Sequence, residues 1–231
     1  MAKVRLEITK GDGIRYLSHL DYARAVERAL RRSKLPVAYS EGFNPHMKVA
    51  YASALGVGVA SDAEYMDMEL KEDVALEVIR QKLTAQLPHG IVLKALKYVG
   101  DRAPALMAVV NQAVYEVTVP MAGSGDDAMK SLNRFYETPQ ILYIKESPKG
   151  RREIDVKQFI PSPIAATVSG SALKLELVIH ITKTGTVKAA EVLDVLVSQF
   201  GLPVHQASAI ITRKALYIVS DSSRLTPMET I

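Results

Sequence analysis

Cysteine is absent from all 231 residues of the chain. The chain therefore forms no disulfide, offers no thiol nucleophile and provides no cysteine ligand for a zinc or iron–sulfur centre. Its five histidines form no pair at i,i+4 and no His-x-Glu pattern, so a metal site would need ligands from distant positions. We expect no metal and no cofactor on this chain.

Long apolar runs are also absent, because none approaches the roughly 20 residues that span a bilayer. Residues 1–5 lead directly into an alternating strand pattern, so we expect no signal peptide, no membrane partner and a cytoplasmic location. The composition, 48% hydrophobic and 23% charged, is typical of a folded globular protein. At roughly 100–150 residues per domain, the length allows one large domain or two small ones.

Charge is distributed unevenly along the chain. Residues 1–50 carry a net charge of +5 and residues 61–80 carry −5, whereas the whole chain carries only +4. A basic patch beside an acidic strand and helix suits an anionic partner such as RNA. The alternative is an ordinary charged solvent face, which charge alone favours.

The hydrophobic pattern of the first hundred residues predicts the element order β-α-β-β-α-β. Ser18 and Asp21 form a capping arrangement that starts the first helix, which ends near Ser33 and is expected to bury Leu20. The predicted strands and helices are residues 3–9, 18–33, 49–59, 65–70, 72–87 and 91–99. This order is typical of a ferredoxin-like fold, an antiparallel sheet with both helices on one face.

The second half of the chain repeats this order loosely. We therefore predict an α+β protein of two ferredoxin-like modules with antiparallel sheets and helices on one face. The first module is residues 1–100 and carries the polar motifs, and the second is residues 111–220 with an inserted hairpin. The polar residues 221–231 are expected to form a flexible tail.

Strand alternation also predicts an open face on the first sheet. The first and third strands of a ferredoxin-like sheet are neighbours, so Lys3, Arg5 and Glu7 are expected to lie opposite the third strand. That strand presents a candidate partner-binding surface made of Tyr65, Asp67 and Glu69.

Two polar segments stand out in the first module, residues 15–21 at the helix start and the loop 39–48. In the loop, Gly42 permits a positive φ and Asn44 precedes a proline, which favours a turn. Such a turn can present Phe43 for stacking while His46 and Lys48 contact phosphate. Alternatively, Phe43 fills the core and His46 bonds to backbone, and both interpretations stay open at this stage.

The candidate binding residues for RNA or another ligand come from these two segments and from the arginines on the outer side of the first helix. They are Arg15, His19, Arg24, Arg28, Arg31, Arg32, Tyr39, Ser40, Gly42, Phe43, Asn44, His46 and Lys48.

A catalytic triad of Ser18, His19 and Asp21 is unfavourable, because side chains within one helical turn fan out instead of converging. Capping explains Ser18 and Asp21 better. His19, His46 and Lys48 remain as catalytic candidates for acid–base chemistry.

Several motifs resemble those of the radical-SAM-associated family of bacterial proteins. They are residues 13–21, 27–32, 35–48, 55–58, 64–65, 87–91 and 153–156. The sequence departs from the family pattern at Met47, where a proline commonly follows the histidine. The resemblance implies a radical-SAM enzyme as partner and a genomic neighbourhood with ribonuclease and ribosomal-protein genes, so RNA or a ribosomal component is a further expected partner.

Three hypotheses follow from these observations. The first, which we prefer, is an accessory protein without independent catalytic activity that binds RNA or a ribonucleoprotein and acts with a separate radical-SAM enzyme. The second is a metal-independent ribonuclease that uses His19 or His46 as acid or base. The third is a protein adaptor that docks on the radical-SAM partner.

Overall fold

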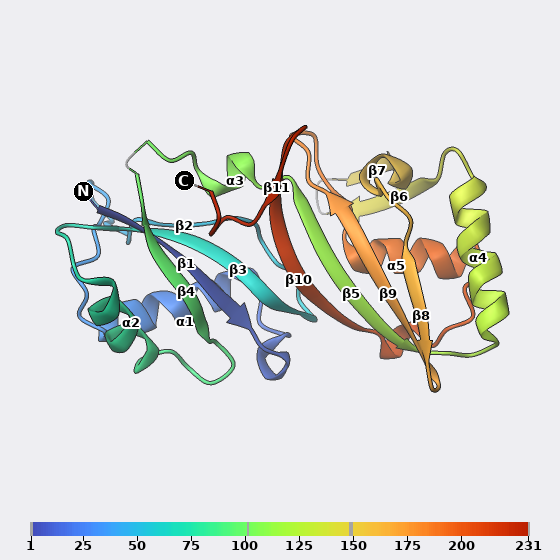
Figure 1. The fold of residues 1–231 in the computed structure, drawn as a ribbon, viewed down its shortest axis with the longest axis horizontal. Helices are drawn as coiled ribbons and strands as arrows, with labels where there is room; N and C mark the ends of the chain where they lie inside the picture. Colours follow the sequence, from blue (N-terminus) through green and yellow to red (C-terminus); the bar gives the residue numbers. More distant parts are fainter. Residues whose placement is uncertain (1, 101, 148–149, 231) are drawn as a thin grey trace. The chain divides into compact units, whose positions relative to one another are not determined.

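The computed structural model describes residues 2–100, 102–147 and 150–230 of the chain (Figure 1). The chain divides into two compact units, Met1–Asn111 with Ala215–Ile231, and Gln112–Lys214. Both units combine helices with antiparallel strand pairs, so the predicted α+β class and antiparallel pairing are confirmed. No helix within the three described ranges is long and apolar enough to cross a bilayer.

In the first unit, the main elements follow one another as β-α-β-β-α-β. They are β1 (Ala2–Lys10), α1 (His19–Arg32), β2 (Val49–Tyr51), β3 (Val59–Leu70), α2 (Leu76–Thr84) and β4 (Leu93–Val99). Strand β1 lies between β4 and β3, and β2 pairs with β3. Helices α1 and α2 lie on the same face of these strands (Figure 1).

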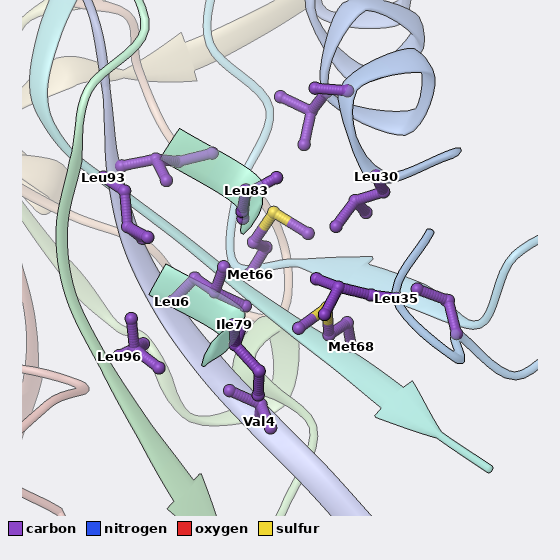
Figure 2. Packing of buried hydrophobic residues seen from close by; sticks show 14 of the residues in the cluster. Val4, Leu6, Leu30, Leu35, Met66, Met68, Ile79, Leu83, Leu93 and Leu96 are labelled. Carbon is purple, nitrogen blue, oxygen red and sulfur yellow. The ribbon is translucent and has the colours of Figure 1, made fainter. Parts of the chain in front are cut away.

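Strand alternation builds the core of this unit. Every second residue of β1 and β3 points to the helix face, and the helices close over them, as Figure 2 shows. The fully buried side chains at this layer include Val4, Leu6, Ile8, Met66, Met68, Leu30, Ile79 and Leu83. The period of two read along residues 3–9 therefore reports a real inward face.

The predicted strand 49–59 is shorter than expected. Only Val49–Tyr51 forms β2, because the following segment leaves the sheet to meet the start of α1, where the amide of Gly58 donates to the carbonyl of Arg15 at 2.9 Å. Strand β3 correspondingly begins at Val59, earlier than the predicted residue 65.

Both helices also differ in detail from the sequence prediction. Leu20 is 65% exposed, because Tyr22 and Val26 occupy the inward stripe of α1. Helix α2 is limited to residues 76–84, since the hydroxyl of Tyr98 bonds the backbone of Val74 (2.9 and 2.7 Å) and holds the residues before the helix in an extended path.

In the second unit, β9 lies between β5 and β8, and β6 and β7 form a separate two-stranded hairpin. Its elements are β5 (Gln112–Pro120), α4 (Gly125–Glu137), β6 (Leu142–Ser147), β7 (Gly150–Asp155), β8 (Ala165–Ser169), β9 (Ala172–His180) and α5 (Ala189–Ser198). Strand β10 (Ile210–Val219) begins in this unit and ends in the first, to which α3 (Leu106–Val109) and β11 (Arg224–Leu225) also belong. Strand β8 was not predicted, since its five residues are mostly exposed and carry no alternation.

The second face of the first unit's sheet is covered, contrary to the predicted open face. The expected register is present, with Arg5 opposite Asp67. However, Arg5 is 3% exposed, Asp67 6% and Tyr65 3%. The guanidinium of Arg5 donates to both carboxylate oxygens of Asp67, at 2.7 and 2.9 Å, which makes a buried bidentate ion pair.

The C-terminal segment, expected to be a flexible tail, packs on this ion pair. Arg5 also donates to the carbonyl of Pro227 at 3.1 Å and to the hydroxyl of Thr230 at 3.2 Å, and Lys97 donates to the carbonyl of Thr230. The backbone amide of Thr226 donates to Glu229 Oε2 at 2.7 Å, which closes a turn within the segment. Residue 231 lies outside the described residues.

The predicted partner-binding surface therefore needs correction. Tyr65 and Asp67 are buried, and only Glu69 stays partly exposed, in an ion pair with Lys48 at 3.2 Å. The sequence pattern predicted the facing residues but not the layer that covers them.

The buried ion pair yields a stability prediction. Replacing Asp67 by alanine leaves the Arg5 guanidinium buried without its carboxylate, so we expect the free energy of unfolding to fall by about 3–5 kcal/mol, measured by urea denaturation. Glu69→Ala is the matched control, because it breaks a half-exposed pair and is expected to cost less than about 1 kcal/mol. Equal losses for the two variants would contradict the packing described.

Candidate nucleic-acid interface

Helix α1 carries a row of arginines on its solvent side. The helix begins after Ser18, whose Oγ accepts from the amide of Asp21 at 3.2 Å, which confirms the predicted cap. Arg24, Arg28 and Arg31 follow one another at i, i+4 and i+7, so they lie on one stripe. These residues and Arg32 are all exposed, and we call the four the arginine row.

The four members of the arginine row differ in how far neighbouring groups engage their donors. Arg24 lies 3.4 Å from Asp21, and Arg32 donates to the carbonyl of Gln86 at 2.8 Å. Within the part of the chain that the structure describes, Arg28 and Arg31 form no ion pair, so the Glu27–Arg31 pair that helical spacing favours is not formed. Their guanidinium groups are accordingly open to an external anion.

The loop 39–48 is closed by hydrogen bonds at its base. The amide of Ser40 donates to the carbonyl of His46 at 2.8 Å, and the amide of His46 donates to Ser40 Oγ at 3.1 Å. Ser40 Oγ also lies 2.9 Å from His46 Nδ1. Gly42 turns the chain with a φ of 116°, in the region that favours glycine.

The tip of this loop points into solvent. Phe43 is 106% exposed, so the alternative in which it fills the core is wrong. Met47 is buried and anchors the loop. Tyr39 and Asn44 are exposed, whereas the ammonium of Lys48 is engaged by Glu69.

The polar segment at residues 15–21 is anchored by Lys10, which is 1% exposed. Its ammonium donates to the carbonyls of Arg15 and Leu17 at 2.8 Å each, and lies 3.5 Å from the carbonyl of Gly56. A buried ammonium is stable only when such acceptors replace water. Lys10 thereby joins the end of β1 to the segment before α1 and to the segment before β3.

Arg15 itself stands beside Tyr16. Its guanidinium lies 4.9 Å from the centre of the Tyr16 ring, donates to the Tyr16 hydroxyl at 3.0 Å and pairs with Asp12. The hydrogen bond to Tyr16, followed by that to Asp12, raises the pKa of Arg15 above its ordinary value. Tyr16 is 68% exposed, so this end of the unit also presents an aromatic ring beside a cation.

His19 packs among aromatic rings at the start of α1. Its ring centre lies 5.3 Å from that of Tyr51, edge to face, and Tyr22 lies next to Tyr51 in turn. The Tyr22 hydroxyl donates to the carbonyl of Thr9 at 2.9 Å, whereas the Tyr51 hydroxyl has no hydrogen-bond partner among the described residues. Burial, followed by the negative charges of Glu27 and Glu64, raises the pKa of Tyr51 above its ordinary value.

The two polar segments do not form one site. Lys10, which holds the segment of Arg15, pairs with Ser61 at the beginning of β3. The base of the loop 39–48 bonds instead to Glu69 near the end of β3, through the amide of Ala38 at 2.8 Å. These positions are eight residues apart along β3, or roughly 26 Å at about 3.3 Å per residue.

The catalytic candidates His19 and His46 do not converge on one site. The ring of His19 contacts Tyr51, and that of His46 contacts Ser40, with no contact between the two histidines among the described residues. Across the same residues, no three His, Asp or Glu side chains are placed to hold a metal ion.

Residues 3–189 match a family described as uncharacterized protein conserved in bacteria, DUF2344. The chain belongs to this family. No curated protein matches the sequence. For the predicted resemblance, this confirms an uncharacterised bacterial family, and the association with radical-SAM enzymes stays a prediction.

Two solved structures align with this DUF2344 protein, each with 10% sequence identity. One is a chain of a Cbf5-Nop10-Gar1 complex, with a TM-score of 0.51 over 99% of this chain and 53% of that chain. The other is a chain of an archaeal box H/ACA sRNP Nop10-Cbf5 complex, with a TM-score of 0.42 over 92% and 46%. The DUF2344 chain thus spans about half the length of each.

Sequence patterns missed three residues that shape this surface of the DUF2344 protein. Lys10 continues the inward parity of Val4, Leu6 and Ile8, and that parity was the available signal for its burial. Tyr51 and Tyr16 carried no such signal, because the partners of one and the exposure of the other depend on segments distant in sequence.

The aromatic cluster yields a paired prediction. Tyr22→Phe loses the bond to Thr9 and is expected to cost about 1 kcal/mol of unfolding free energy. Tyr51→Phe removes a buried hydroxyl without a partner among the described residues, so stability at neutral pH should be unchanged or higher. Chemical denaturation of both variants tests this.

The pH dependence of the same variants gives a second readout. The folded-state pKa of Tyr51 is raised, so its neutral side chain contributes in full to the free energy of unfolding below the ordinary tyrosine pKa of about 10. That contribution is lost as the pH rises above this value. The wild type should therefore lose stability above about pH 10 more steeply than Tyr51→Phe. Parallel pH profiles would contradict the buried environment of Tyr51.

Proposed function

We propose that this DUF2344 protein binds RNA through the arginine row of α1. The observation that carries the proposal is the row itself, in which four exposed guanidinium groups lie on one side of a single helix and two of them form no ion pair among the described residues. Guanidinium groups bind phosphate with paired hydrogen bonds, and the phosphate backbone supplies most of the affinity for nucleic acid.

The spacing of the row suits a polymer better than a single anion. Arg24 and Arg31 are seven residues apart, or about 10 Å along the helix axis at 1.5 Å per residue. Adjacent guanidinium groups can therefore contact successive phosphates of one strand. The net charge of +5 in residues 1–50 adds a field that attracts the same polyanion.

We also propose a fold type for each unit. We infer that the first unit is a ferredoxin-like module, supported by its β-α-β-β-α-β order and by the position of β1 between β3 and β4. We infer the same for the second unit, with the β6-β7 hairpin inserted.

A radical-SAM enzyme as partner also stays part of the proposal. It rests on the motifs quoted above and on the lack of cysteine, since iron–sulfur chemistry then requires another chain or domain. A ribosomal component as the RNA source stays a prediction, as do the ribonuclease and adaptor hypotheses.

The arginine row gives a direct test. The double variant Arg28→Ala with Arg31→Ala should weaken binding of a labelled RNA oligonucleotide by about tenfold or more in anisotropy titrations. The slope of log affinity against log salt should also become shallower, by roughly 0.7 for each lost phosphate contact to a single strand. A DNA oligonucleotide of the same sequence shows whether the sugar matters.

The control removes the same charge elsewhere. Lys174 and Lys183 are exposed residues of the second unit, and changing both to alanine should leave affinity and salt slope near those of the wild type. Equal losses in both double variants would indicate general charge attraction and contradict a site on α1. Undetectable binding by the wild type would overturn the proposal.

A further inference from the structure

Phe43 is the most exposed of the large hydrophobic side chains in the described ranges. An exposed apolar ring gains free energy by burial, so a sequence that keeps one at a loop tip gives up stability unless a partner covers it. Its surroundings on the loop show what kind of partner fits.

Hydrogen bonds within the loop and a buried anchor at its base hold the Phe43 ring in position. Bonds between Ser40 and His46 close the base of the turn, and the amide of Lys48 donates to the carbonyl of Ala38 at 2.8 Å below them. Met47 secures the base in the hydrophobic core. A side chain presented on a closed turn loses less conformational entropy on binding than one on an open loop.

The surroundings of the ring are mostly polar. Ser40, Glu41, Asn44 and His46 contribute hydroxyl, carboxylate, amide and imidazole groups, and the exposed Tyr39 and Pro45 add a small apolar area. A protein partner needs roughly 800 Å² on each side, far more than one ring supplies. A single planar group with hydrogen-bonding edges, such as a nucleobase, matches one ring among polar side chains.

The path of the chain joins this loop to the arginine row. Helix α1 ends at Arg32, and Val37 then bridges Leu70 at the end of β3. The base of the loop bonds to Glu69, the neighbouring residue. The loop and the second half of α1, with Arg28 and Arg31, therefore lie toward the same end of the first unit.

We propose that the loop 39–48 is a stacking finger for an unpaired base, and that the ligand class of this surface is single-stranded RNA. The inference rests on the proposed function, because the arginine row holds the phosphates on either side of the stacked base. In a duplex, neighbouring pairs cover both faces of each base, so Phe43 reaches only an unpaired one.

The absence of tryptophan from the chain allows a specific probe. Phe43→Trp introduces a single indole at the loop tip, and stacking with a base quenches indole fluorescence. The probes are a single-stranded RNA of about 12 nucleotides, within the footprint range of single-strand binders, and the same strand in a duplex. Met129→Trp, at an exposed position on α4, is the matched control.

We expect the single strand to quench Phe43→Trp, the duplex to quench it much less, and neither to quench Met129→Trp. Phe43→Ala should bind the single strand about tenfold more weakly and the duplex as tightly as wild type does. Because Phe43 contacts solvent, Phe43→Trp and Phe43→Ala are both expected to keep the wild-type thermal unfolding midpoint.

Other outcomes separate this inference from the proposed function. RNA binding that is sensitive to Arg28→Ala with Arg31→Ala, yet leaves Phe43→Trp unquenched and Phe43→Ala unimpaired, would overturn the stacking finger and keep the arginine row. Equal quenching of Phe43→Trp and Met129→Trp would also overturn it. Undetectable RNA binding by the wild type would overturn both.

Discussion

The first unit depends on the hydrogen bonds that the buried ammonium of Lys10 donates to backbone carbonyls. A charge at 1% exposure needs acceptors in place of water, and three backbone carbonyls within 3.5 Å of it belong to the segments before α1 and before β3. This side chain at the end of β1 therefore holds the segment that leads to the Ser18 cap of α1.

A second constraint comes from the sheet, whose two faces are both covered. Helices α1 and α2 cover one face, and the C-terminal segment caps the Arg5–Asp67 ion pair on the other. The arginine row lies on the outer side of α1. Such an exposed row of cations favours a polyanion that lies along it over a small substrate that needs a pocket.

The loop 39–48 shows how a motif dense in polar residues serves presentation more than chemistry. Its serine and histidine bond to each other, its lysine pairs with Glu69, and its methionine enters the core. Phe43 projects from this anchored base into solvent.

Local patterns in the sequence determined much of this protein. The alternation along β1, the cap at Ser18 and the spacing of Arg24, Arg28 and Arg31 each depend on residues a few positions apart, and each is found in the structure. Tertiary structure alone decided that Asp67 is buried, that the C-terminal segment covers Arg5, and that the two polar segments lie at different ends of β3. The reason is that periodicity reports which face of an element a residue occupies, whereas what covers that face comes from residues tens or hundreds of positions away.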